Sequence, residues 1–428
     1  MTFPRIYLVK QEFPDRGIKD IAKEVQWQLQ EADFAAKVKR GAKIAIGVGS
    51  RGIAQIAVIV KAVVDYWKDN GCNPFVFPAM GSHGAATSEG QAAVLAHYGI
   101  FPEAIGCPVI SSLDVMPMGR TPEGIETYMD RSAFESDAVM LVGRVKWHTD
   151  FNGKIESGLC KMTAIGLGKF AGAQQYHGFG HRIGLEQVIR SVFKQIAKSG
   201  KILGGIAILE DANHSTAQLT ALYAENFLKM DEKLLALVKT WAGRIPVNAL
   251  DILVLDEIGK DISGTGMDTK VVNRSTMAYY NCYANAPKVE RIFIKDLSKL
   301  SGGNALGMGL ADIVTDRLIG KVDWSSTYIN GLSSSILAST RTPIHFPTDR
   351  ECLEKLVPTV GKTGSRELTI GWIQNTMNLR LMALSENLLP EISGNPAIKI
   401  LSQATELPFD PDGNLPRIDE LAKLQMTG

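Results

Sequence analysis

Histidine, lysine and glycine are concentrated in one segment of this chain. Between Arg144 and His181 the sequence reads RVKWHTDFNGKIESGLCKMTAIGLGKFAGAQQYHGFGH, which includes three of the seven histidines, among them His148 and His177. Imidazole exchanges protons near neutral pH and binds transition metals, and a lysine amine can join covalently to a cofactor. A glycine-rich stretch of this length without regular structure predicts a functional loop.

Two shorter loops carry chemistry of the same kind. GVGSRG at 47–52 places Ser50 and Arg51 where the next helix should begin, which is a natural position for holding a phosphate or a carboxylate. GSHGAATSEG at 81–90 holds His83 among small residues. Each loop also fits an ordinary turn between a strand and a helix, so neither indicates a function alone.

Other chemistries lack their motifs. The chain contains no GxSxG and no HExxH, so a serine hydrolase or a zincin has no motif support. The five cysteines are scattered without a CxxC pair, which disfavours an iron–sulfur or cysteine-rich zinc site and is typical of reduced thiols in the cytoplasm, where we expect the protein to act.

The overall charge and hydropathy also exclude some partners. Lys and Arg number 46 against 45 Asp and Glu, and this net charge of +1 provides no general basic field for nucleic acid. The first residues do not resemble a signal peptide, and no apolar run reaches the roughly 18 residues of a membrane span. We therefore expect neither a nucleic-acid partner nor a membrane partner.

The order of apolar runs indicates how the three loops are positioned. In the first half of the chain, short buried-strand patterns alternate with helical periodicity. Strands are predicted at 43–48, 74–78, 137–142 and 204–209, and helices at 53–67, 91–98 and 185–197. This alternation predicts an α/β fold with a mostly parallel sheet covered by helices, in which ligands bind beyond the carboxyl ends of the strands.

The pattern restarts after GRIPVNA, and 428 residues allow two or three domains. Further strands are predicted at 251–255, 291–294 and 368–372, with a helix around 310–318. We predict an N-terminal cofactor-binding catalytic domain at 1–246, a smaller α/β domain at 247–400, and a tail at 401–428 that packs back on the first domain. The active site is expected in the cleft between the two domains.

Taken together, the three loops resemble the nickel-pincer lactate racemase family. The matching features are SR after the first strand, GSHGAAT-E after the second, and the His…Lys…His series of the long segment. The resemblance implies a racemase or epimerase of a lactate-like 2-hydroxy acid. Such an enzyme transfers hydride to and from a covalently attached nickel-pincer nucleotide, and it depends on cofactor biosynthesis proteins.

The resemblance also implies a role for individual residues. Lys161 would carry the cofactor and His177 would bind nickel, an assignment supported by the interval of 16 residues between them, with His181 as a competitor for the metal. His83 and His148 would be the two acid–base residues.

The remaining assignments concern the cofactor and the substrate. Ser50 and Arg51 would contact the cofactor. In the second half, GKDISGTGMDTK at 259–270 is similar to the family segment with a substrate-facing lysine, for which Lys270 is the nearest match and Lys260 a rival.

Two departures from the family leave the substrate side chain open. No acidic residue stands shortly before Arg51, and Gly84 follows His83 where lactate racemases often have arginine. One alternative is a non-catalytic or cofactor-handling protein of the same fold that binds a nucleotide or an anion. Retention of His83, His148, Lys161 and His177 together disfavours it, because a protein that only binds a ligand does not need two bases. Another alternative is a nickel-free oxidoreductase that uses a diffusible nicotinamide.

Overall fold

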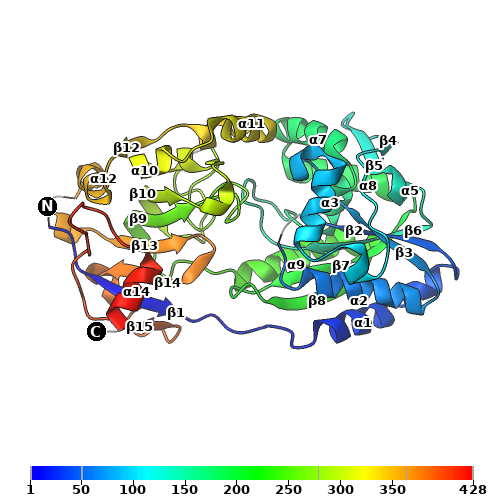
Figure 1. The fold of residues 1–428 in the computed structure, drawn as a ribbon, viewed down its shortest axis with the longest axis horizontal. Helices are drawn as coiled ribbons and strands as arrows, with labels where there is room; N and C mark the ends of the chain where they lie inside the picture. Colours follow the sequence, from blue (N-terminus) through cyan, green and yellow to red (C-terminus); the bar gives the residue numbers. More distant parts are fainter. Residues whose placement is uncertain (1, 50–51, 278, 363, 427–428) are drawn as a thin grey trace. The chain divides into compact units, whose positions relative to one another are not determined.

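The computed structural model describes residues 2–49, 52–277, 279–362 and 364–426 (Figure 1). Its contacts divide the chain into two compact units. We call Pro14–Ala242 the first unit, and Met1–Phe13 together with Gly243–Gly428 the second unit. The division at 242/243 lies close to the predicted boundary near 247, but the residues before Pro14 belong to the second unit.

The first unit is built around a five-stranded sheet with the order β3-β2-β6-β7-β8. All neighbours are parallel except β8, which runs antiparallel to β7. The strands are β2 (Lys43–Val48), β3 (Asn73–Pro78), β6 (Ala138–Arg144), β7 (Ile202–Glu210) and β8 (Thr216–Tyr223). The four predicted strands of this half are therefore present, and the mostly parallel sheet is confirmed.

Helices cover both faces of this sheet, because successive residues of a strand point to opposite sides. Ile44, Ile46 and Val48 of β2 pack in a core with α1 (Ile21–Ala32) and α2 (Ile56–Asp69). Ala45 faces the opposite core. That second core is formed with α7 (Lys169–Ile183), α8 (Leu185–Ala197) and α9 (Phe227–Trp241).

Shorter elements complete the first unit. A two-stranded antiparallel sheet joins β4 to β5. The bounds are α3 (Ser88–His97), α4 (Pro102–Ile105), β4 (Val115–Arg120), β5 (Glu126–Asp130), α5 (Arg131–Phe134) and α6 (Leu159–Lys161).

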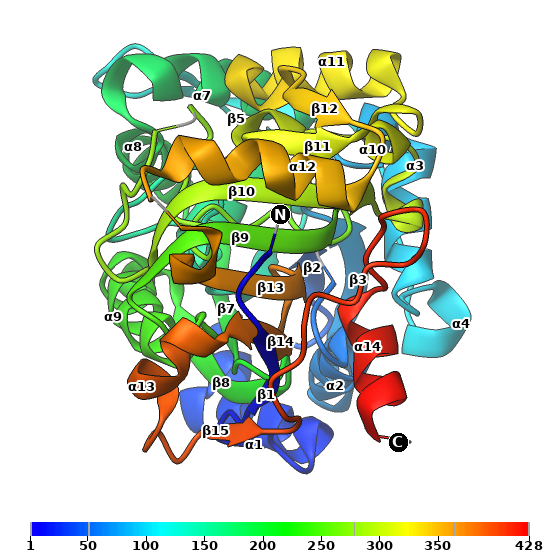
Figure 2. The same ribbon diagram turned by 90° about the vertical axis from the view of Figure 1, so that its left-hand side faces the viewer.

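The second unit contains an eight-stranded sheet, whose order runs β12-β11-β10-β9-β13-β14-β1-β15 (Figure 2). The strands from β12 to β13 are parallel, and β14, β1 and β15 add antiparallel neighbours. The strands are β1 (Ile6–Gln11), β9 (Ala249–Ile258), β10 (Lys288–Leu297), β11 (Ile313–Thr315), β12 (Ile344–Phe346), β13 (Ile370–Asn375), β14 (Asn378–Ser385) and β15 (Ile398–Ile400). The helices are α10 (Asp316–Ile319), α11 (Trp324–Ser334), α12 (Asp349–Leu356), α13 (Leu389–Ile392) and α14 (Ile418–Met426).

Two predictions for this half are wrong. The helix expected at 310–318 is instead β11 followed by the short α10, because the β-branched run Ile313–Thr315 pairs in parallel with β10. The predicted first domain also includes the residues before Pro14, but β1 pairs antiparallel with β14, almost the whole chain away. Neither pairing partner can be read from local periodicity.

The tail also packs differently from the prediction. Leu415, Ile418 and Leu421 are buried in the core of the second unit and do not return to the first. Charged groups reinforce this docking: Lys295 Nζ donates to the carbonyl of Pro416 at 2.6 Å, and the Ile418 N–H donates to a carboxylate of the second sheet. Among the helices of the described residues, none has both the length and the apolar character that crossing a membrane requires.

Candidate functional site

His83 and His148 leave the first sheet at the same edge. His83 follows β3 and His148 follows β6, and both strands are parallel to β2, which lies between them. Because neighbouring strands are about 4.8 Å apart, the loops that follow β3 and β6 leave the sheet roughly 10 Å from each other. The loop after β2, which begins between them, carries Ser50 and Arg51; these two residues lie outside the described residues.

The His83 loop is closed tightly at its base. Gly84 has a φ of +62°, and a Cβ there would lie 2.4 Å from the carbonyl carbon of Gly90. Thr87 caps α3 by accepting the N–H of Gly90. The glycine that stands where the family often has arginine is therefore required by the backbone, since a larger side chain does not fit this conformation. The His83 side chain itself is exposed.

A buried carboxylate holds the His148 loop. Glu156 is 0% exposed, and its Oε2 accepts the backbone N–H of His148 at 2.5 Å while its Oε1 accepts that of Gly153 at 3.1 Å. Lys239, from α9, places its Nζ 2.5 Å from Oε1 and supplies the counter-charge. Sequence reasoning missed Glu156, because a single glutamate in a glycine-rich segment carries no pattern that marks it as buried.

The environment of His148 decides which ring nitrogen carries its proton. The backbone N–H of Asp150 donates to His148 Nδ1 at 3.1 Å, and the ring packs against Phe151 with centroids 4.6 Å apart. A nitrogen that accepts a hydrogen bond cannot also carry a proton, so the neutral imidazole is protonated at Nε2. In this loop conformation neutral His148 therefore presents its Nε2–H as a hydrogen-bond donor.

The segment after the His148 loop is helical, which corrects the expectation of an irregular loop. Lys161 ends α6, a π-helical turn follows at Met162–Gly166, and α7 carries His177. Glycine serves close packing here: a Cβ on Gly166 would lie 2.8 Å from the carbonyl oxygen of Ala79. The glycines that suggested a loop instead allow these helices to approach the residues that lead to His83.

Asp231 positions the short helix that carries Lys161. Its carboxylate, on α9, accepts the N–H of Leu159 at 3.2 Å and that of Cys160 at 2.8 Å, so it caps the N-terminus of α6. A Cβ on Gly158 would lie 2.6 Å from this carboxylate, and only glycine leaves it room. Burial raises the pKa of Asp231 to about 6, against the hydrogen bonds that favour its charged form.

Lys161 and His177 interact electrostatically. Burial lowers the pKa of His177 below its usual range, and the positive charge of Lys161 lowers it further. Asp150 opposes this shift, while His181 adds to it. The structure thus brings the predicted attachment lysine close to a histidine that is neutral at pH 7, and a neutral imidazole is the form that binds metals.

The other lysines of the segment occupy different environments. The side chain of Lys154 is exposed, whereas Lys169 is fully buried and donates hydrogen bonds inside the unit. Lys161 is only partly buried. Burial therefore distinguishes Lys161 from Lys169 as an attachment point, because a group joined to Lys169 would have to displace packed side chains.

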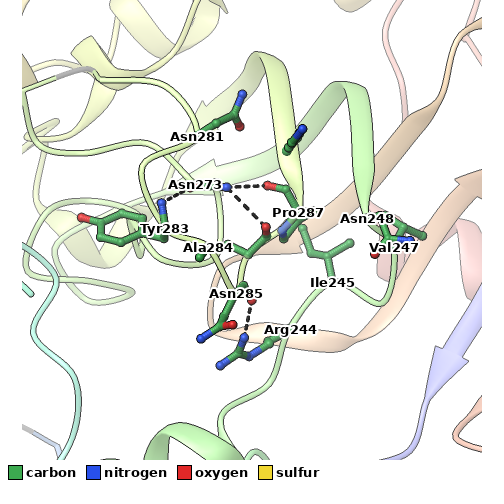
Figure 3. Close-up of a pocket in the computed structure, with 12 residues that line it drawn as sticks. Arg244, Ile245, Val247, Asn248, Asn273, Asn281, Tyr283, Ala284, Asn285 and Pro287 are labelled. Atoms are coloured by element: carbon green, nitrogen blue, oxygen red, sulfur yellow. Dashed lines mark hydrogen bonds between the residues drawn. The ribbon is translucent and has the colours of Figure 1, made fainter.

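In the second unit, the two candidate substrate lysines differ in what they contact. Lys260 Nζ donates to the carbonyl of Gly264 within its own turn at 2.6 Å. Lys270 is 8% exposed, and its Nζ lies 5.8 Å from the centre of the Tyr283 ring. Tyr283 in turn lines a pocket of about 470 Å³ (Figure 3).

This pocket is lined mostly by polar groups. Asn273 joins its walls: its amide donates to the carbonyl of Pro287 at 2.9 Å, and its carbonyl accepts the N–H of Tyr283 at 2.7 Å. Arg244 donates to the carbonyl of Asn285, and burial lowers its pKa (Figure 3). The walls therefore combine amide groups with a cationic side chain.

The donor set bears on how a metal could be held. Within the described ranges, no three His, Cys, Asp or Glu side chains gather into a group able to bind a metal ion. A metal that arrives inside an organic group with its own donors needs fewer protein ligands, and a single neutral imidazole such as His177 suits that arrangement.

The glycines at 47–52 are also spaced as G-x-G-x-x-G, the spacing of dinucleotide-binding loops. Glycine spacing alone therefore does not distinguish a nicotinamide dinucleotide from the nickel-pincer nucleotide. In that motif the helix begins within the loop, and an acidic residue about 20 residues further on binds the ribose. Here α2 begins only at Ile56, and Pro78 and Ala79 stand at the end of β3. The nicotinamide alternative lacks these features.

Comparison with known proteins supports the architecture. No family model matches the chain, and no curated protein matches it. Among solved structures, the apoprotein of lactate racemase from Thermoanaerobacterium thermosaccharolyticum is similar, with a TM-score of 0.50 and 12% identity over 87% of this chain and 99% of that one. A Thermotoga maritima protein gives a TM-score of 0.50 and 13% identity over 75% of this chain and 82% of that one. The chain has a lactate racemase-like fold.

Proposed function

We propose that this protein racemises or epimerises a lactate-like 2-hydroxy acid with a covalently attached nickel-pincer nucleotide. The observation that carries the proposal is the pairing of Lys161 with a neutral His177 on successive helices of a lactate racemase-like fold. The two sheet-edge histidines support it, since a protein that only binds an anion has no use for two imidazoles beside the same strand ends.

The residues of the first unit fit such a cofactor. Lys161 would hold the nucleotide covalently, and His177 would donate its imidazole to nickel. Ser50 and Arg51 would contact the nucleotide from the loop after β2. When bound, the cofactor supplies a hydride acceptor, which is needed because the Cα–H of a 2-hydroxy acid is too weakly acidic for simple removal by a histidine. The protein would position this cofactor against the substrate.

The protein's own contribution is proton transfer. As hydride leaves Cα, one histidine accepts the hydroxyl proton and a planar 2-keto acid results. As hydride returns to the keto acid, the other histidine, in its imidazolium form, donates a proton to the keto oxygen. We assign these two roles to His83 and His148. The reverse direction exchanges the two roles. We assign the substrate carboxylate to Lys270, with Lys260 as the alternative.

The test is racemisation by protein co-produced with the cofactor biosynthesis proteins. Single enantiomers of lactate and of longer 2-hydroxy acids are incubated with the purified protein, and the products are separated by chiral chromatography. We expect conversion of at least one acid in both directions, with nickel bound. Protein that carries the Lys161 adduct and nickel but converts none of the acids would instead be a cofactor-handling protein.

A further inference from the structure

Lys169 is a buried charge that the proposed reaction does not use. It is 0% exposed, and its Nζ donates to the carbonyl of Pro78 at 2.8 Å and to Oε1 of Gln91 at 2.7 Å. Asp130 Oδ2 lies 3.7 Å from the same nitrogen. A single ammonium group therefore joins the end of β3, the helix α3 and the end of β5.

Gln91 extends this contact to the His83 loop. Its Nε2 donates to the carbonyls of Gly81 at 3.0 Å and Met80 at 3.3 Å, and it lies 3.5 Å from the carbonyl of His83. Gln91 is itself 0% exposed. The amide thus accepts a hydrogen bond from Lys169 on its oxygen and contacts three carbonyls of the segment 80–83 with its nitrogen.

Lys169 stands on the helix that carries His177. It is the first residue of α7, and its φ of +52° is a conformation that a lysine adopts only when the surrounding contacts favour it. The same region packs closely on the loop, because a Cβ on Gly81 would lie 2.9 Å from the Cβ of Ala173. The start of α7 and the His83 loop therefore share one interface.

We propose that Lys169 and Gln91 are positioning residues that set the place of the His83 loop relative to α7. The importance of this arrangement for catalysis rests on the proposed function, because the contact between Lys169 and Gln91 would then connect the loop of the acid–base residue His83 to the helix of the nickel ligand His177. The contact itself does not depend on that function. Burial lowers the pKa of Lys169 to about 8, with Asp130 opposing the shift, so maintaining this ammonium group inside the unit is costly.

Two substitutions separate positioning from simple core packing. Gln91→Glu keeps an oxygen acceptor for Lys169 but removes the N–H donors to the loop carbonyls. Lys169→Met fills the same space without a donor. Lys201→Met is the matched control, because Lys201 Nζ donates to the carbonyl of Ser136 at 2.9 Å in the same unit, away from the loop.

The readout is local amide hydrogen exchange in the full chain without cofactor, together with an NMR pH titration of the His83 ring. In Gln91→Glu we expect exchange at 79–87 to rise on the order of tenfold, with exchange in α8 unchanged. The His83 titration should shift as well. Lys201→Met should leave both as in the wild type. If Lys169→Met does not fold, the result for Gln91→Glu alone tests the inference.

The inference would be overturned if Gln91→Glu showed the same exchange at 79–87 as the wild type and an unshifted His83 titration. A uniform rise of exchange over the whole first unit would overturn it as well. These measurements need neither substrate nor cofactor. If the wild type converts no 2-hydroxy acid, the proposed function fails while the loop contact is still tested. If the wild type is active and the loop is unchanged in Gln91→Glu, only the inference about Lys169 and Gln91 fails.

Discussion

Glu156 binds the backbone of His148 through a carboxylate that no solvent reaches, with Oε2 2.5 Å from the amide nitrogen. A buried carboxylate thus holds the backbone from which the imidazole of His148 extends. Two helix α9 side chains, Lys239 and Asp231, stabilise the segment that holds His148 and Lys161. These two side chains lie more than seventy residues after the groups that they contact, so local sequence does not indicate this role.

Glu156→Gln should impair His148 without removing it. The amide keeps one acceptor for three donors and turns an N–H toward another donor, and Lys239 loses its carboxylate partner while keeping its hydrogen bond to the carbonyl of Gly153. We expect about 1–3 kcal/mol lower stability and a lower kcat with a smaller change in KM. Thermal unfolding and steady-state racemisation measure these effects. The control is Glu232→Gln on the same helix, whose partly exposed pair with Arg190 lies apart from His148. Equal losses in both variants would contradict the assignment.

Lys161 should be the site of covalent attachment. Peptide mass mapping of active protein is expected to show the adduct on the peptide with Lys161 and none on those with Lys154 or Lys169. Lys161→Ala should remove the adduct and abolish racemisation. The physical reason is that Lys161 is partly buried near His177, whereas Lys169 is sealed inside the unit. An adduct on either of the other two lysines would show that the assignment is wrong.

His177 should hold nickel, and its lowered pKa sets the pH range in which it can. Because its pKa lies below the usual value of 6.5, His177 stays neutral at pH values where an ordinary histidine begins to take up a proton. We expect nickel to be retained below pH 6.5 and to be lost from His177→Ala, as measured by metal analysis after dialysis. His83→Ala should retain nickel, and so should His181→Ala. Loss of nickel only from His181→Ala would move the metal to that residue.

Both acid–base histidines should be needed for full racemisation. His83→Ala and His148→Ala are each expected to lower the rate on the order of 10²–10⁴-fold, since each removes one proton-transfer role. In D₂O the product should keep the substrate's hydrogen at Cα, because a hydride does not exchange with water. NMR of the product measures this. Substantial deuterium at Cα would indicate ordinary deprotonation and remove the need for the cofactor.

Asp231 should make stability depend on pH in an unusual direction. Its pKa is raised from 3.8 to about 6, so between these values the folded protein keeps a proton that the unfolded chain has released. The contribution of Asp231 to the free energy of unfolding therefore falls as pH rises from about 4 to 6, by up to about 3 kcal/mol. Denaturant titrations should show this contribution as the difference between the pH profiles of the wild type and of Asp231→Asn. Asp65→Asn, on the partly exposed surface of α2, should keep the wild-type profile.

Local pattern determined much of the first unit. The run KIAIGV predicts β2 with its observed bounds, and the periodicity of 185–197 predicts α8 equally well. Alternation of strands and helices also predicts that His83 and His148 emerge at one sheet edge, as observed. These features follow from sequence because buried strands and amphipathic helices are encoded by residues near one another along the chain.

Tertiary structure decided the features that join distant residues. β1 enters the second sheet through β14, the tail docks on that same unit, and Lys169 meets Pro78 across 91 positions. The glycines of 158–172 predicted a loop, yet in the structure they are the points where helices touch other backbone. A local pattern states that a residue is small or charged, but not which remote group it will contact, because that choice depends on how all the strands and helices pack together.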